Sequence, residues 1–448
     1  MKIAVLLSGG VDSSVSALLL KEKGYNLVGV HLHCFDFCNP QDAEDARRVA
    51  EILNIPFYVF DLTDEFEEKV INYMIRTYEK GLTPNPDVYC NQFIKFGVFF
   101  DKALNLGYEM VASGHYARTQ IDANLTRTDA NNKKDNLNIE SNKRNNSSGN
   151  YLGNISGGHQ GNTSEIHLLK AKDQDKDQTY FLWSIEKEKF SKIIFPVGDL
   201  LKTEVREIAK KYNLPVAEKK ESMGICFVGQ VKLREFLSQY LKPKEGKIID
   251  TEGRILGTHP GYFYFTEGQR HGLNIKVGDG PYYVAQKIPE ENLIVVAKEG
   301  HPLLYSQKIE ITEINILEKE ILFPQTNTDK TKTHADYTQT YADYINNNYS
   351  SGNHPGNLSG NHPGNLSGNH PGNSIIIDVR FRHRQPLVKA KLILRESEYS
   401  LQKSAHSLRG SAFIEFLEPQ KFVAPGQSIV FYKDDIVLGG GIILKRIN

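Results

Sequence analysis

Cysteine, tryptophan and methionine are scarce in this chain of 448 residues, which has four cysteines, one tryptophan and four methionines. The cysteines are Cys34, Cys38, Cys90 and Cys226, and no C-x-x-C pair occurs among them. This usage excludes a disulfide-rich secreted domain and the common zinc-finger spacings. No charged and apolar leader precedes Ile3, so we expect a protein of the reducing cytoplasm.

Long hydrophobic runs and an excess of one charge are also missing. No apolar run approaches the roughly 18 residues that a membrane-spanning helix needs, so we expect no membrane association. The 54 Lys and Arg residues balance 54 Asp and Glu residues, so a nucleic acid would have to be bound by a local patch. The segment from Ile375 onward is the basic part, with 12 Lys and Arg against 7 Asp and Glu.

The first 24 residues read as a strand, a glycine turn and a helix. The apolar run 3–7 is followed by SGGVDSS at residues 8–14 and by a helical pattern that ends near Gly24. Paired glycines let the backbone turn sharply, and the first N–H groups of the next helix attract phosphate. The turn has neither the lysine of a Walker loop nor the G-x-G-x-x-G spacing. An ordinary helix cap is the alternative, because Asp and Ser cap helices well.

Strand and helix patterns go on alternating after this turn. Apolar runs at 27–32 and 57–60 predict buried strands, and residues 43–53 form a helix with one apolar face. This alternation predicts a doubly wound parallel sheet of the α/β class. Ligands bind such sheets beyond the carboxyl ends of the strands, so we expect the site there. The segments concerned follow Leu7, Leu32, Phe60 and Val111.

Three domains are expected, separated in part by low-complexity sequence. Residues 1–229 would form the α/β domain, 230–300 a small central domain of mixed or β structure, and 301–448 an antiparallel β-barrel. Polar segments at about 120–164 and about 326–373 have too few apolar residues to form a core. The second contains the repeat GNHPGNLS, whose His354, His362 and His370 are more typical of a solvated loop than of a metal site.

Cys90 and Cys226 have neighbouring residues that could give them a function. Cys90 lies in a proline-stiffened loop before a helix predicted near 93–104, and a helix N-terminus stabilises a thiolate. Cys226 lies between Gly224 and Gly229, which permit close approach and movement. For every cysteine the alternative is a small buried hydrophobe.

Nine stretches of the sequence resemble the tRNA-specific 2-thiouridylase (MnmA) family. They span the three expected domains and leave both low-complexity segments out. The stretches are SGGVDSS at 8–14, TPNPDVYCNQFIKF at 83–96, ASGHYAR at 112–118, KDQTYFLW at 176–183, FPVGDLLKTEVREIA at 195–209, GICFVG at 224–229, TEGQRHGL at 266–273, APGQSIVFY at 424–432 and LGGGII at 438–443. The resemblance implies a PP-loop ATP pyrophosphatase that acts as a tRNA-uridine 2-sulfurtransferase at the wobble position.

The resemblance also implies roles for individual residues. The nucleophile would be Cys90, the persulfide carrier Cys226, and the two would form a transient disulfide. The ATP-binding residues would be Leu6, Leu7, Ser8, Gly9, Gly10, Val11, Asp12, Ser13, Leu32 and Gly114. The residues that meet the target base would be Asn85, Pro86 and Asp87, and those that meet the rest of the tRNA would be His115, Lys176, Asp177, Gln178, Arg380, Phe381 and Gln427.

The implied cofactors are ATP and Mg²⁺, with no resident metal site. The implied partners are tRNA and a persulfide donor such as a cysteine desulfurase or a relay protein. The chain departs from the family at position 32, which is Leu where some relatives have Met, and at HCFDFCNP, where many relatives have paired cysteines. The two low-complexity segments are extra as well. The roles of Leu32, Cys34 and Cys38 therefore stay open.

The chemistry is consistent with these assignments. Adenylation turns a carbonyl oxygen into a leaving group, a persulfide supplies the sulfur, and Asp87 lies three residues before Cys90 for acid–base assistance. A wobble base must be flipped out of its loop to react. In the basic tail, alternation along a strand predicts Arg380 and Arg382 on one face and Phe381 on the other.

Three alternatives remain at this stage. One keeps the thiolation but routes sulfur through an iron–sulfur cluster on Cys34, Cys38 and one catalytic cysteine. Another is a PP-loop synthetase or amidase that acts on a different substrate and needs no cysteine pair. The last is a tRNA-binding protein with an inactive site, against which the intact SGGVDSS turn argues.

Overall fold

The computed structural model of the chain describes residues 1–35, 40–121, 166–220, 233–275, 277–278, 280–322, 374–394, 407–408 and 410–447. Cys38, Cys226 and the histidines of the GNHPGNLS repeats lie outside these ranges, so the expectations for them stay predictions. Within the described ranges, no helix is both long and apolar enough to cross a membrane.

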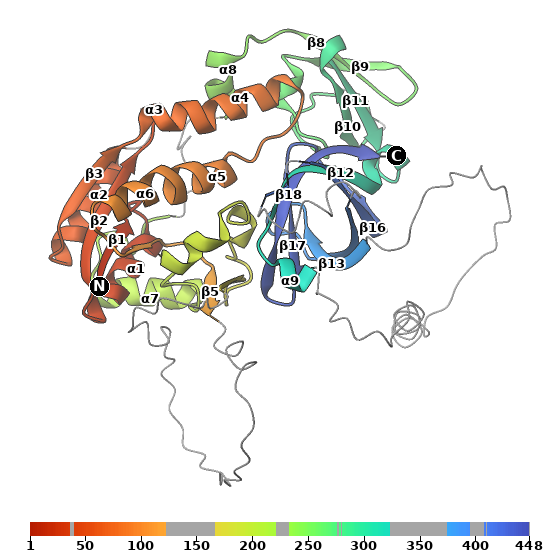
Figure 1. Ribbon diagram of the computed structural model, residues 1–448. Coiled ribbons are helices and arrows are strands. Elements are labelled where there is room, and N and C mark those ends of the chain that lie inside the picture. The colour runs from red at the N-terminus through yellow and green to blue at the C-terminus, as the bar shows by residue number, and fades with distance from the viewer. Residues whose placement is uncertain are drawn as a thin grey trace, which may run out of the picture.

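A five-stranded parallel sheet forms the centre of the N-terminal region (Figure 1). Its strand order is β3-β2-β1-β4-β7, and every neighbouring pair is parallel. The strands are β1 (Lys2–Leu6), β2 (Asn26–His33), β3 (Phe57–Asp61), β4 (Met110–Ala112) and β7 (Ile193–Ile194). Because β1 lies in the middle and is covered on both faces, its sequence is apolar at nearly every residue.

Helices cover both faces of this sheet, which confirms the doubly wound α/β fold. Ile3 and Val5 of β1 face a core shared with α1 (Val11–Glu22), α2 (Pro40–Ile52) and α7 (Lys202–Lys211). Ala4 and Leu6 face the opposite core, where a second group of helical segments packs. These segments are α3 (Thr63–Phe66), η1 (Glu67–Ile71), α4 (Asn72–Glu79), α5 (Pro86–Tyr89), η2 (Cys90–Val98) and α6 (Phe99–Asn105).

The central region contains a small mixed sheet, as expected. Strand β11 is parallel to β8, whereas the other pairs in the order β10-β11-β8-β9 are antiparallel. The end of α4 reaches this region, where the Tyr262 hydroxyl donates to the Glu79 carbonyl at 2.6 Å (Figure 1). The elements are α8 (Leu233–Tyr240), β8 (Gly246–Ile249), β9 (Ile255–His259), β10 (Tyr282–Ile288) and β11 (Leu293–Lys298).

The C-terminal region is a closed antiparallel barrel in the cyclic order β12-β16-β14-β13-β17-β18, because β18 also pairs with β12. Glycines allow β18 to bend between these two neighbours. At Gly440 a Cβ would lie 2.7 Å from the Trp183 ring and 2.8 Å from the Ile429 carbonyl oxygen. The strands are β12 (Tyr305–Ile316), β13 (Ser374–Arg380), β14 (Val388–Leu394), β15 (Ser407–Leu408), β16 (Ala412–Lys421), β17 (Ser428–Lys433) and β18 (Ile436–Ile447).

A hairpin from the N-terminal region joins the barrel sheet. Its strands are β5 (Arg118–Ile121) and β6 (Ile166–Leu169), and Leu169 pairs with Ile436 at the start of β18. Asp435 in the turn before β18 reinforces this junction, since it lies 2.9 Å from Arg118 and 3.2 Å from Lys170. The N-terminal sheet and the barrel are thereby connected through backbone pairing, and the exact domain bounds stay predictions.

Candidate active site

The glycine turn after β1 is closed in by two neighbouring segments. Gly9 has φ +72°, and a Cβ there would lie 2.1 Å from the carbonyl oxygen of Asp42 in α2. A Cβ on Gly114, just after β4, would lie 2.5 Å from the Ser13 backbone nitrogen. Both close approaches require glycine. The structure therefore brings Gly9, Ser13 and Gly114 together, although they come from two strand ends far apart in the sequence.

The first turn of α1 presents its backbone N–H groups at this site. Its N-cap is Gly10, and no side chain of the described residues caps it. The hydroxyls of Ser13 and Ser14 instead donate to the Gly10 carbonyl at 3.1 and 2.7 Å, and the Ser8 amide donates to the Ser13 hydroxyl at 3.2 Å. These bonds hold the turn without using the first amides of the helix. An oxygen-rich anion is the ligand that such a helix start favours.

Asp12 in the first turn of α1 is contacted by two side chains from distant segments. Lys202 Nζ lies 2.6 and 2.7 Å from the two Asp12 carboxylate oxygens, and the Tyr116 hydroxyl donates to Asp12 Oδ1 at 2.9 Å. Lys202 begins α7 and is largely buried. The site thus holds a lysine beside the glycine turn, where its charge is balanced by Asp12.

A second lysine contacts the turn from the other side. Lys219 Nζ donates to the Gly9 carbonyl at 2.9 Å and forms ion pairs with Asp42 and Asp45 at 2.7 and 2.5 Å. Burial opposes the charged form, but the hydrogen bonds to Asp42 and Asp45 raise the pKa of Lys219 above its usual value. Lys219 is therefore a cation at neutral pH, close to the turn.

Cys90 lies inside a helix and not in front of one. The helix predicted near 93–104 begins at Pro86, because proline is pre-organised for the first helical position, and Asn85 precedes it. Asp87 and Cys90 are three residues apart in this helix and so share a face. Cys90 is buried, with 3% of its surface exposed, and from this residue the helix continues as the wider turns of η2.

All three regions of the chain meet at the loop before Cys90. The Thr83 amide donates to the Pro425 carbonyl at 2.9 Å, and Gln427 Nε2 donates to the carbonyls of Thr83 and Pro84 at 3.0 Å each. From the central region, Lys287 Nζ lies 3.4 Å from the Thr83 hydroxyl. The barrel and the central region therefore hold the loop that leads to Asn85, Pro86 and Asp87.

Several residues that the resemblance assigned to tRNA make contacts within the protein. Gln178 accepts from the Tyr116 amide through its side chain and donates to the Tyr116 carbonyl through its backbone, both at 2.9 Å. Asp177 is buried and forms an ion pair with Arg380 at 3.0 Å. Asp177, Arg380 and Gln427 thus join the N-terminal region to the barrel, whereas Gln178 contacts its own region. The contact of these residues with tRNA stays a prediction.

His115 and Phe381 are also placed within the protein. The His115 ring lies 2.9 Å from the Ser113 hydroxyl, and burial together with the charge of Lys95 lowers the pKa of His115 well below its usual value. Phe381 is buried, and its ring packs against Phe416 with centroids 5.4 Å apart. His115 is thus a neutral ring at pH 7.

The expected pairing of Arg380 and Arg382 on one strand face is wrong. Strand β13 ends at Arg380, so the alternation does not extend two residues further. Arg380 has 7% of its surface exposed and lies over the Tyr432 ring, whereas Arg382 is exposed. Arg380 forms a buried ion pair with Asp177, so of these two arginines Arg382 is the surface cation.

The remaining predicted residues have simple positions. Leu32 is half-buried near the carboxyl end of β2, and Lys176 is half-buried before Asp177. Cys34 is buried among the apolar side chains on one face of the sheet. The structure thus gathers the residues of the glycine turn with Gly114 in one place and Asn85 to Cys90 on one helix, while Cys226 lies outside the described residues.

The motifs alone do not predict Lys202, Lys219 or Tyr116 as residues of the site. Lys202 lies in FPVGDLLKTEVREIA and Tyr116 in ASGHYAR, two of the stretches that resemble the family, but neither stretch indicates the contact with Asp12. The one sequence signal for Lys202 is its place at the start of a predicted helix that follows a strand. Its contact with a carboxylate 190 positions away depends on how α7 packs against α1.

Comparisons with known proteins agree with this arrangement. The sequence matches families described as "tRNA methyl transferase HUP domain" over residues 1–230, "tRNA methyl transferase PRC-barrel domain" over 234–298 and "Aminomethyltransferase beta-barrel domain" over 358–443. The tRNA-specific 2-thiouridylase MnmA of Listeria monocytogenes is 35% identical over 99% of this chain and 94% of its own length. The tRNA-specific 2-thiouridylase MnmA 1 of Geobacillus kaustophilus is 34% identical over 99% of this chain and 95% of its own. With this identity over nearly its whole length, the chain belongs to the tRNA-specific 2-thiouridylase (MnmA) family.

Proposed function

We propose that this protein is an enzyme that uses ATP to replace the 2-oxygen of the wobble uridine of tRNA with sulfur. The observation that carries the proposal is the glycine turn, where the uncapped start of α1 lies between Lys202 and Lys219. Backbone amides and two cations are the groups that bind a triphosphate. Membership of the 2-thiouridylase family supports tRNA as the second substrate.

The nucleotide binds with its phosphates at the start of α1. Lys202 and Lys219 neutralise the phosphates, and Gly9 and Gly114 allow the close approaches of Asp42 and Ser13 that shape the turn. Asp12 is the carboxylate of the turn that would hold Mg²⁺, which proteins commonly bind through one or two carboxylates together with phosphates. Lys202, which contacts both Asp12 oxygens in the structure, would then pair with the phosphates. When bound, the ion supplies neutralisation of the triphosphate charge.

The reaction proceeds through an adenylated base. The uracil 2-oxygen attacks the α-phosphorus of ATP, an O–P bond forms and pyrophosphate leaves. The terminal sulfur of a Cys226 persulfide then attacks carbon 2, and the C–O bond breaks as AMP leaves. The Cys90 thiolate attacks Sγ of Cys226, which breaks the sulfur–sulfur bond to the base and leaves 2-thiouridine with a Cys90–Cys226 disulfide. A thiol reductant supplies two electrons to restore both cysteines.

The residues before Cys90 position the target base. Asn85 and Pro86 start the helix that carries Cys90, and Asp87 shares a face with Cys90, where it can accept a proton during these steps. The base reaches this place by flipping out of the anticodon loop. The sulfur comes from a persulfide donor, such as a cysteine desulfurase or a relay protein.

A reconstituted reaction tests the proposal. Purified protein is incubated with ATP, Mg²⁺, unmodified tRNA and a persulfide donor, and the products are measured by mass spectrometry. The expected result is AMP, pyrophosphate and 2-thiouridine in equal amounts. If ATP is cleaved without tRNA and no thiolated base appears, the chain acts on another substrate. Iron that co-purifies in stoichiometric amounts, and whose removal abolishes thiolation, would instead support the cluster route.

A further inference from the structure

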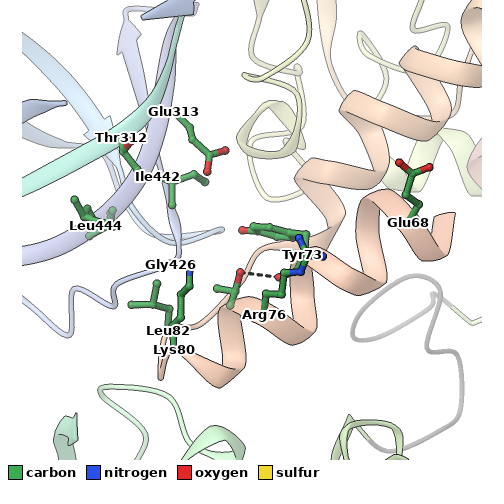
Figure 2. A pocket seen from close by; sticks show the side chains of 12 residues that line it. Glu68, Tyr73, Arg76, Lys80, Leu82, Thr312, Glu313, Gly426, Ile442 and Leu444 are labelled. Carbon is green, nitrogen blue, oxygen red and sulfur yellow. Dashed lines mark hydrogen bonds between the residues drawn. The ribbon is translucent and has the colours of Figure 1, made fainter. Parts of the chain in front are cut away.

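A cavity of about 340 Å³ lies between α4 and the barrel, next to the loop that precedes Cys90 (Figure 2). One wall is formed by Tyr73 and Arg76 of α4 together with Lys80 and Leu82, which follow this helix. The opposite wall comes from the barrel strands β12 and β18, with Thr312 and Ile442. The N-terminal region and the barrel both contribute, so the cavity exists only where the two regions meet.

A flat aromatic ring forms part of the α4 wall. Tyr73 stacks on Tyr89, with ring centroids 3.5 Å apart and planes within 10° of parallel. Tyr89 is fixed in turn by its hydroxyl, which donates to Glu313 of the barrel. Tyr73 lines the cavity and Tyr89 does not, so Tyr89 covers one face of the Tyr73 ring without being part of the cavity wall. Its chain neighbour is Cys90.

Other lining residues suit a nucleotide. Arg76 near the end of α4 and Lys80, the residue that caps this helix, are exposed and one turn apart, so they offer positive charge beside the Tyr73 ring. On the barrel side Ile442 and Leu444 present apolar surface, beside the polar Thr312 and Glu313, and Glu68 is the other carboxylate of the lining. An aromatic ring, apolar side chains on the opposite wall and adjacent cations are features that bind single-stranded RNA, whose bases stack and whose phosphates pair with Lys and Arg.

The cavity borders the loop that leads to the proposed site for the target base. Leu82 precedes Thr83, and Gly426, which also borders the cavity, packs against Thr83 so closely that a Cβ would lie 2.7 Å from its amide. We propose that the cavity binds a second nucleotide of the anticodon loop, a direct neighbour of the thiolated uridine, with its base on Tyr73 and its phosphate at Arg76 and Lys80. This inference rests on the proposed function.

A double-mutant cycle between the protein and the tRNA tests the contact. The variants are Tyr73→Leu and, as a matched control, Tyr58→Leu on β3, whose side chain is 54% exposed away from the cavity. The substrates are intact tRNA and tRNAs with an abasic residue directly before or after the wobble uridine. With the native protein, one of the two abasic substrates is expected to raise KM about tenfold with kcat unchanged.

Tyr73→Leu is expected to raise KM for intact tRNA by the same factor, and the abasic substitution should then have no further effect. Tyr58→Leu should behave like the native protein. Multiplicative effects of Tyr73→Leu and the abasic residue, or no effect of either abasic residue, would overturn the inference. A rise in KM for ATP in place of that for tRNA would assign the cavity to free nucleotide and would overturn it as well.

Two further variants separate binding from damage to the fold. Tyr73→Phe keeps the ring, so KM for intact tRNA should stay at the native value. Arg76→Ala should lower the slope of log Kd against log salt by about 0.7, the value for one phosphate contact to a single strand. An unchanged slope would contradict the phosphate contact. If the native protein forms no 2-thiouridine, the proposed function fails. If it forms 2-thiouridine but the effects of Tyr73→Leu and the abasic residue on KM multiply, only the inference about the cavity is refuted.

Discussion

Asp12 connects three segments of the chain at the level of a single side chain, through Lys202, Tyr116 and its own place in α1. We predict that Asp12→Ala lowers tRNA-dependent pyrophosphate release at least a hundredfold, because the variant loses the carboxylate that we propose to hold Mg²⁺ beside the phosphates. Released pyrophosphate is measured at saturating ATP. The exposed Asp101→Ala on α6 serves as the control, and near-native release by a folded Asp12→Ala protein would remove the assignment of the glycine turn to ATP.

His115 gives a pH dependence of stability. Burial and the charge of Lys95 lower its pKa in the folded protein, while the unfolded chain keeps a value near 6.5. Below that pH the unfolded state binds a proton that the folded state does not, so the free energy of unfolding falls as the pH is lowered. The decrease is at most about 1.4 kcal/mol per pH unit. Denaturant titrations at several pH values between 7 and 5 should show that the free energy of unfolding decreases less for His115→Gln than for the native protein. Parallel curves of this free energy against pH would contradict the lowered pKa of His115.

Single helices and strands show what the sequence could predict. The strand at 27–32 and the helix at 43–53 are confirmed as β2 and α2, because their apolar patterns are set by burial against the sheet. The helix that carries Cys90 was predicted seven residues too late, because Pro86 was read as stiffening a loop although it occupies the first helical position. The ion pairs of Lys202 and Lys219 could not be predicted, since they depend on how distant helices pack.

The close packing of α1 against the segment after β4 leads to a prediction at this scale. Gly114→Ala places a methyl group 2.5 Å from the Ser13 amide, so the start of α1 must shift. We expect the free energy of unfolding to fall by about 1–3 kcal/mol and the affinity for ATP to fall with it. Gly257→Ala on β9 is the matched control, because its nearest neighbour is 3.8 Å away. Equal stability of the two variants in urea would contradict the packing argument.

Across the whole molecule, the N-terminal region and the barrel are joined by the buried pair of Asp177 and Arg380. Arg380→Ala leaves Asp177 buried without this cation, so the free energy of unfolding should fall by about 3–5 kcal/mol. Arg382→Ala should leave stability unchanged and lower the salt dependence of tRNA binding by about one phosphate contact. Chemical denaturation measures the stability of each variant, and salt titrations measure its tRNA binding. If Arg380→Ala changed the salt dependence and Arg382→Ala the stability, Arg380 would be the surface contact.

Cys90 and Cys226, the two cysteines that we propose to be catalytic, are expected to have different roles, and variants separate them. Cys226→Ser should still adenylate tRNA but accept no persulfide. Cys90→Ser should accept sulfur on Cys226 and then stall, with the base still joined to Cys226 through a sulfur–sulfur bond. Mass spectrometry of protein and tRNA after one turnover distinguishes the two states. A persulfide on Cys90 in the native protein would reverse the two roles, and a persulfide on Cys34 or Cys38 would contradict the role of Cys226.

Peptide mapping of the native protein after a single turnover without reductant is the sharpest test of sulfur transfer through two cysteines. We predict a disulfide between Cys90 and Cys226, which requires their Cα atoms to come within about 4.4–6.8 Å during the reaction. The disulfide should form in the same amount as 2-thiouridine and should be absent when ATP is left out. A disulfide that contains Cys34 or Cys38 in place of Cys90, or thiolation without any disulfide, would contradict the account.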